Sequence, residues 1–106
     1  MPKYLVQASY TADGTKGLLA EGGTGRREAV EKVLRSCGGT LEWMYFAFGD
    51  NDVYIVADMP DDVSMAATAI AVRATGAVQS KATPLISPED IDAATKKSVE
   101  FRAPGE

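Results

Sequence analysis

The chain has no histidine and a single cysteine, Cys37, among its 106 residues. Without histidine, the Ser-His-Asp and Cys-His catalytic sets are excluded, and so are the common zinc and haem ligand sets. One cysteine cannot form an internal disulfide. Cys37 lies on the apolar face at the end of a predicted helix, where a cysteine is usually inert. We therefore expect no metal site and no bound cofactor.

The sequence also lacks long apolar runs and clusters of positive charge. No run approaches the about 20 apolar residues of a membrane-spanning helix, and residues 1–4 lead into a strand pattern instead of a signal peptide. The net charge is −4, and the basic residues form no stripe that could neutralise phosphates. The sequence predicts a cytoplasmic protein that binds neither nucleic acid nor membrane.

What the sequence contains is typical of a globular chain. Apolar residues make up 45% and charged residues 25% of the composition. A chain of 106 residues can bury one continuous core and is too short for two ordinary domains. We expect a single domain over residues 1–106 with a loose tail from about residue 100.

The first half of the chain predicts a strand and then a helix. Residues 3–10 alternate with a period of two, and the more apolar face carries Tyr4, Val6, Ala8 and Tyr10. Apolar positions recur at helical spacing over residues 26–37, and Gly38 supplies a left-handed stop. After a turn-rich entry that can begin a short helix, we expect the glycine-rich segment at residues 21–25 to be irregular.

The second half predicts two strands, a helix, a strand and a final helix. Residues 40–48 carry apolar side chains at both odd and even positions, which face opposite sides of a strand, so both faces of this strand need to be covered. A hairpin turn at residues 49–52 leads to a returning strand over residues 53–59. The remaining elements are a helix over residues 63–74 capped by Asp61 or Asp62, a strand over residues 77–83, and a helix from Pro88 to about Val99.

The helix at residues 63–74 is apolar nearly all round, so the sequence offers two faces for packing. We expect one face to lie on the sheet, with Val63, Ala66, Ala67, Ile70 and Ala74. The opposite face carries Met65, Ala69 and Val72. An apolar outer face predicts a further contact that could build a larger assembly.

This element order predicts an α+β, ferredoxin-like βαββαβ fold with a four-stranded antiparallel sheet and a short C-terminal helix. Two helices would cover one face of the sheet and leave the other face bare. Because the strand at residues 40–48 is apolar on both parities, we expect the bare face to meet the same face of a second copy. The predicted assembly is a homodimer of the dimeric α/β-barrel type.

Residues 39–62 resemble the centre of GYD-domain proteins, in which a glycine, a tyrosine and an aspartate in the hairpin precede a strand and a Pro-Asp-Asp turn. Gly49 and Asp52 match that motif, and Asn51 stands where the tyrosine is expected. The likeness covers most of the chain, from residue 4 to about residue 94. It implies a small, bacterial, dimeric α/β-barrel relative whose biochemical function is largely unassigned.

Two groups of residues are candidates for binding. Aromatic side chains with polar neighbours could hold a small aromatic or acidic ligand, and the predicted ligand-binding residues are Gln7, Ser9, Trp43, Tyr54, Asp58 and Lys81. Thr24, Arg26 and Arg27 follow the glycines before a helix and could hold a phosphate or carboxylate. That spacing matches neither a P-loop nor a dinucleotide fingerprint, and a flexible loop with solvated arginines is the alternative.

Two function classes remain open. The first is a small-molecule-binding or regulatory module that holds its ligand without changing it. The second is a cofactor-free enzyme of the monooxygenase or isomerase kind that dimeric α/β barrels often host, with Tyr54, Asp58 or Lys81 as proton donor or base. A closed pocket with a buried, pKa-shifted carboxylate or lysine would favour catalysis.

Overall fold

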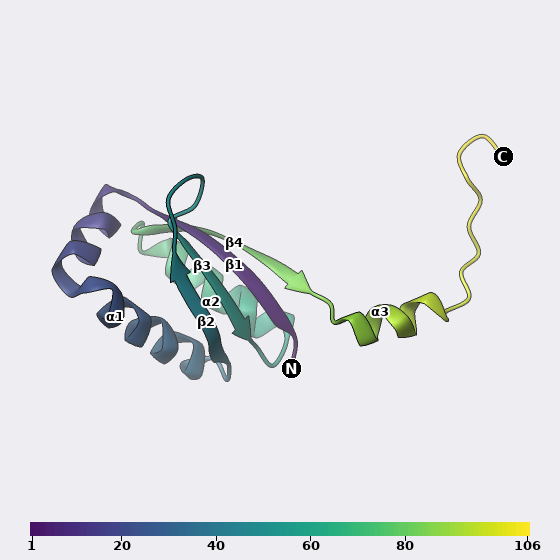
Figure 1. Ribbon diagram of the computed structural model, residues 1–106, viewed down its shortest axis with the longest axis horizontal. Helices are drawn as coiled ribbons and strands as arrows, with labels where there is room; N and C mark the ends of the chain where they lie inside the picture. Colours follow the sequence, from purple (N-terminus) through teal and green to yellow (C-terminus); the bar gives the residue numbers. More distant parts are fainter.

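Seven elements follow one another in the computed structural model, which describes residues 1–106 (Figure 1). They are β1 (Lys3–Tyr10), α1 (Ala12–Ser36), β2 (Thr40–Phe46), β3 (Val53–Asp58), α2 (Asp62–Ala74), β4 (Val78–Leu85) and α3 (Pro88–Thr95). The strands form one antiparallel sheet in the order β2-β3-β1-β4. The predicted ferredoxin-like α+β fold with a C-terminal helix is confirmed.

Helix α1 is longer than the sequence predicted. It begins at the N-cap Thr11 and continues through the glycine-rich segment with one non-helical residue, Gly22, at φ 75° and ψ 172°. The expectation of an irregular segment over residues 21–25 is therefore wrong except at this kink. A Cβ added to Gly23 would lie 3.4 Å from the Phe46 ring, an ordinary contact distance, so the helix passes close to β2 at this residue.

The predicted helix caps are confirmed where they depend on local chemistry. Gly38 has a φ of 82°, and Gly39 N–H donates to the Leu34 carbonyl across 2.8 Å, which closes α1 in a Schellman motif. Asp61 caps α2 by accepting from the Ser64 N–H across 2.8 Å. These caps set the helix ends that the sequence anticipated.

The phase of α2 is the reverse of the prediction. Met65 and Thr68 are buried against the sheet with Ala69 and Val72 partly buried beside them, whereas the exposed face carries Val63, Ala66, Ala67 and Ile70. Both stripes have helical spacing, so apolar pattern alone could not choose between them. The threonine is tolerated inside because its hydroxyl donates to the Ser64 carbonyl across 2.9 Å.

Several element ends also differ from the prediction. Strand β2 ends at Phe46 instead of Phe48, and β3 ends at Asp58 instead of Met59. Strand β4 continues to Leu85, two residues beyond the predicted end, and α3 ends at Thr95, about four residues early. The pattern of apolar residues continues past each hydrogen-bonded end, so it locates such ends only to within a few residues.

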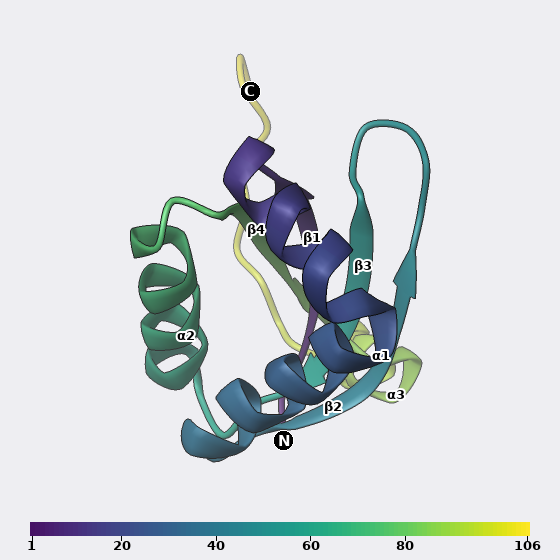
Figure 2. The same ribbon diagram turned by 90° about the vertical axis from the view of Figure 1, so that its left-hand side faces the viewer.

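Helices α1 and α2 lie on the same side of the sheet, α1 over β2 and β1 and α2 over β4 (Figure 2). Between them and the sheet lies the buried core, formed by Tyr4, Ala8, Leu34, Val53, Ile55, Ala57, Met59 and Met65. The other side of the sheet carries no helix. We call it the open face. None of the three helices has both the length and the apolar character that crossing a membrane requires.

The last element, α3, stands away from the sheet beyond the end of β4 (Figure 1). Every residue from Pro84 to Arg102 is exposed. The radius of gyration is 17.0 Å, whereas a compact chain of this length has about 13 Å. The C-terminal segment therefore accounts for the elongated shape.

Two glycines in α1 generate opposite predictions. A methyl group on the buried Gly14 would overlap the Ala77 carbonyl oxygen, whereas Gly17 has open space around it. We expect Gly14→Ala to lower the free energy of unfolding by about 1–3 kcal/mol through overpacking. We expect Gly17→Ala to raise it by about 0.5–1 kcal/mol because alanine restricts the unfolded chain. Urea unfolding of both variants tests the pair, and equal effects would contradict the packing at Ala77.

Candidate functional site

A cavity of about 80 Å³ lies between the sheet and the two helices. Its walls come from the inner faces of β1, β3 and β4, from Met44 of β2, and from α1 and α2. Most of the lining is apolar: Val6, Ala8, Tyr10, Val30, Val33, Leu34, Met44, Val53, Ile55, Met65, Ala69, Val72, Val78 and Ala82. Arg26, Thr68 and Ser80 complete it.

The cavity exists because the helices lie over opposite edges of the sheet. Helix α1 packs mainly on β2 and α2 on β4, so neither covers the centre fully (Figure 2). Ala8 on β1, Ala69 on α2 and Ala82 on β4 border the space with side chains too short to fill it. The sequence pattern could not reveal this space, because its lining residues read as ordinary core.

Arg26 is the one charged residue in the lining. Its side chain is 27% exposed, and its Nη1 lies 3.3 Å from Glu21 Oε1 of the same helix. An exposed ion pair of this length contributes little, so Glu21 can yield its place to another carboxylate. Arg26 can therefore provide a guanidinium fork at the wall of an otherwise apolar cavity.

Tyr10 stands beside Arg26 in the lining and ends β1. Its N–H donates to Asp52 Oδ2 across 2.8 Å, which ties the strand end to the β2–β3 connection. Burial raises the pKa of the Tyr10 phenol, and the nearby Arg26 guanidinium opposes that rise. The phenol is therefore a neutral donor at physiological pH.

A second, more open groove of about 410 Å³ adjoins the end of β1. Its lining is Tyr10, Thr15, Leu18, Gly23, Phe46, Ala47, Phe48 and Asp52. Tyr10 lines both spaces, so the inner cavity and the outer groove adjoin at this residue.

The six predicted ligand-binding residues lie elsewhere, and none of them lines either space. Gln7 pairs with Tyr54 on β3 and with Lys81 on β4, and Tyr54 pairs with Tyr45 on β2. These four side chains form one row across the open face. Trp43, Ser9 and Asp58 occupy neighbouring positions on the same face.

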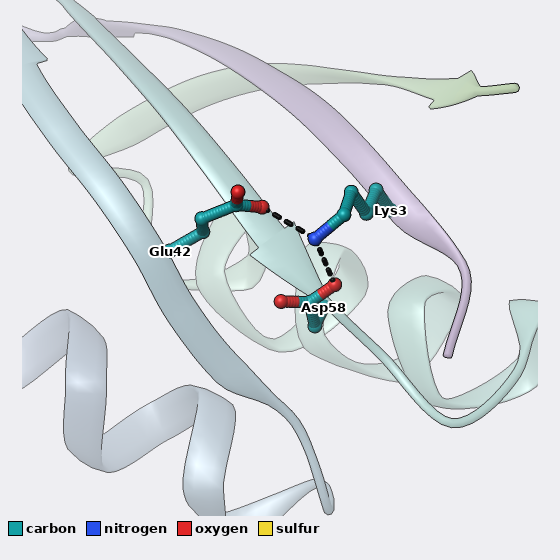
Figure 3. Close-up of polar contacts among 3 residues, drawn as sticks. All are labelled: Lys3, Glu42 and Asp58. Atoms are coloured by element: carbon teal, nitrogen blue, oxygen red, sulfur yellow. Dashed lines mark hydrogen bonds and ion pairs between the residues drawn. The ribbon is translucent and has the colours of Figure 1, made fainter. Parts of the chain in front are cut away.

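Asp58 is already engaged at one end of the open face (Figure 3). Lys3 Nζ lies 2.8 Å from Asp58 Oδ1 and 2.6 Å from Glu42 Oε2. The hydrogen bond to Asp58, followed by that to Glu42, raises the pKa of Lys3. All three groups stay partly exposed, so this cluster contributes little to stability and leaves Asp58 poorly placed as a base.

The three predicted anion-binding residues do not converge. Arg26 lines the cavity, whereas Arg27 Nε faces Glu31 Oε1 at 3.8 Å on the exposed side of α1. Thr24 is exposed within the same helix. The structure also brings no three cysteine, aspartate or glutamate side chains together as a metal-ligand cluster. Of these candidates, Arg26 alone belongs to an enclosed space.

The hairpin residues that resemble the GYD motif, at positions 49–52, hold the chain next to the cavity. Gly49 adopts a φ of 124°, and Asp52 N–H donates to the Ala8 carbonyl across 2.9 Å. Asn51 lies 3.5 Å from the Tyr54 hydroxyl on the side of the open face. The aspartate thus orders the wall that carries Tyr10, and the asparagine lies away from the cavity.

The position of α2, one wall of the cavity, depends on a hydrogen bond from the Tyr4 hydroxyl to Asp62 Oδ1. This bond is the main cause that raises the pKa of Tyr4 to about 12 from its ordinary 10. Because the folded-state pKa is the higher one, the stabilisation is complete below pH 10 and is lost as the pH rises to about 12. The protonated phenol is thus a condition for the docked helix.

We expect Tyr4→Phe to lower the free energy of unfolding at pH 8 and to remove this alkaline dependence. Urea titrations of both proteins at pH 8, 10, 11 and 12 measure the difference between them. The two values should converge toward pH 12. A difference that stays constant across this range would contradict the assigned role of the phenol proton.

Searches of the curated proteins and of the solved structures find no match to the chain. The family profile described as GYD domain matches residues 4–95. The match includes the sheet except its first residue, Lys3, both helices that border the cavity, and α3. Because it covers most of the 106 residues, the chain belongs to the GYD domain family.

Proposed function

We propose that this GYD domain is a homodimeric binding module that holds a compact organic acid in the cavity between sheet and helices. The observation that carries the proposal is a partly open, mostly apolar cavity with one cationic side chain, Arg26, in its wall. Small-molecule sites have this form, an apolar body with a few polar groups that fix the orientation of the ligand. The ligand class is therefore a small apolar ring or branched chain with one carboxylate.

The size of the cavity limits the ligand. The space measures about 80 Å³, and a single water occupies about 10–15 Å³ on the same kind of measure. A dry cavity that holds benzene measures about 150 Å³, so a single ring with a carboxylate enters only if the helices move apart to enlarge the space, and a fused ring system or a nucleotide is excluded. Arg26 would exchange its 3.3 Å contact with Glu21 for the carboxylate of the ligand.

Catalysis has less support than binding. Neither a carboxylate nor a lysine belongs to the cavity lining. Tyr54, Asp58 and Lys81, which a cofactor-free monooxygenase or isomerase would use as acid or base, lie on the open face. Tyr10 has a raised pKa, so it can donate a hydrogen bond but is a poor base at neutral pH.

The homodimer is supported by the open face. Trp43 is 40% and Tyr45 69% exposed, and their rings pack edge to face with centroids 5.5 Å apart. Exposed aromatic pairs of this kind are enriched in interface cores. A two-fold partner would cover them with the same surface. A further contact between dimers is supported by the exposed Val63 and Ile70 on the outer side of α2. This face takes the place of the one that the sequence predicted, with Met65, Ala69 and Val72.

Benzoate tests the binding proposal, because it combines one ring with one carboxylate. We expect it to bind the wild-type protein and to be recovered unchanged. Arg26→Gln should weaken binding about 10- to 100-fold, the value of a charge-assisted hydrogen bond. Arg27→Gln removes the adjacent charge from the exposed side of α1, so it should leave the affinity unchanged. Isothermal titration calorimetry measures all three affinities.

Benzyl alcohol provides the matched neutral probe. Arg26→Gln should change its affinity by less than about threefold, because the charge-assisted bond is missing in both cases. Equal losses for Arg26→Gln and Arg27→Gln would show a nonspecific charge effect and would overturn the assignment. Conversion of either probe during incubation would favour the enzyme alternative.

A second prediction concerns the dimer. We expect Tyr45→Glu to weaken it at least about 30-fold, because a charge would be buried at the centre of an aromatic interface. Phe48→Glu is the control, since Phe48 is a fully exposed aromatic of the same hairpin that lines the outer groove on the helix side. Light scattering over a concentration series measures the mass. A wild-type protein that keeps the mass of one chain at high concentration contradicts the dimer.

A further inference from the structure

The C-terminal segment, residues 86–101, is formed but packs on nothing within its own chain. Helix α3 has a complete start, because Ser87 accepts from the Asp90 N–H across 3.1 Å and Pro88 occupies the first turn. None of its residues is buried. The large apolar side chains of the segment are exposed by 47% to 80%, and they are Ile86, Ile91, Val99 and Phe101.

A helix of this length needs a surface to pack against. Helix α3 has eight residues, whereas isolated helices shorter than about 12–15 residues are marginal in water even for favourable sequences. Most helical stability in proteins comes from tertiary packing of an apolar face. The capped start and the exposed apolar side chains together indicate a segment whose packing surface belongs to another chain.

The total surface area favours a second copy as that chain. A monomer of 11.2 kDa exposes about 5,700 Å² on the general scaling, and this chain exposes 7494 Å², about 1,800 Å² more. Two copies that bury this excess would bury about 3,600 Å² in total, within the about 2,000–5,000 Å² of obligate homodimers. A small or transient partner would leave much of the excess exposed.

Charge complementarity places the segment on the open face. Helix α3 carries Glu89, Asp90 and Asp92 and no basic residue. Lys81 projects from β4 on the open face, is exposed, and takes part in no ion pair. Strand β4 leads directly into the segment, so a two-fold dimer of open faces with its axis across the strands brings β4 of one copy over β4 of the other and each segment to that edge.

We propose that residues 86–101 form an exchanged arm, in which α3 of each chain packs on the β4 side of the second copy's open face, beside Lys81. This inference rests on the proposed dimer and adds a reciprocal contact to it. The apolar side of α3, with Ile91, packs on the second copy's β4 beside the exposed Leu85, and its acidic side faces Lys81. The segment then gains the tertiary packing that it lacks within its own chain.

Amide hydrogen exchange of the full chain tests the arm. If α3 is docked on a second copy, residues 88–95 should exchange at least about tenfold more slowly than a free helix, and dilution into the monomer range should remove this protection. Ile91→Asn should remove the protection at all concentrations. Ala93→Asn introduces the same side chain on the opposite side of α3 and should retain it. Lys81→Gln should weaken the dimer severalfold more at low salt than at high salt.

The outcomes separate the arm from the dimer. A dimeric mass with α3 unprotected overturns the arm and leaves the sheet-to-sheet dimer in place. A monomeric mass overturns both. Protection that is independent of concentration in a monomer shows that the arm folds back on its own chain, which overturns the exchange. If Ile91→Asn and Ala93→Asn lose protection equally, the loss comes from the lower helix propensity of asparagine and not from a lost contact. This result also overturns the arm.

Discussion

Two helices must cover one face of a four-stranded sheet, and in this protein they do so from opposite edges. The arrangement follows from the chain order: α1 connects β1 to β2, α2 connects β3 to β4, and β2 and β4 form the two edges of the sheet. Each helix packs mainly on the edge strand beside it. The inner cavity, the exposed aromatic face and the unpacked C-terminal segment all follow from how little of the sheet two helices can cover.

The cavity keeps its shape because its walls are tied together at a few points. Tyr4 on β1 anchors Asp62 at the start of α2, and Asp52 holds the end of β1. The first turn of α1 is held against β4 by the Thr11 N–H, which donates to the Ala77 carbonyl across 3.0 Å. These contacts lie around the cavity and not inside it, so the lining can remain mostly apolar.

Local chemistry made much of the fold predictable from the sequence. The Asp61 cap, the Gly38 stop and the Ser87–Pro88 start depend on residues a few positions apart, and all three are in place. The phase of α2 was not predictable, because its two apolar stripes have the same spacing. In the structure Met65 and Thr68 face the sheet, and the Tyr4 hydroxyl, 58 positions from Asp62, ties the start of the helix to β1.

The candidate site was predictable only in part, and the reason lies in the same geometry. The sequence groups Gln7, Tyr54 and Lys81 as polar candidates, and the sheet places them in one row, but on the face without helices and not in a cavity. The cavity residues gave no signal, because an alanine that borders a space and one that fills a core look alike in sequence. Arg26 was identified for its charge, although as part of a loop and not as part of a cavity wall.

The cavity and the open face are not independent surfaces, because the sheet between them is one layer of backbone. On β1, Leu5 and Gln7 point to the open face while Val6 and Ala8 point to the cavity side. Any change of twist in the sheet, such as one that a partner on the open face would cause, therefore moves residues of both faces together. If ligand affinity differs between monomer and dimer, the ligand must change the dimer affinity by the same factor, because the two equilibria share one thermodynamic cycle.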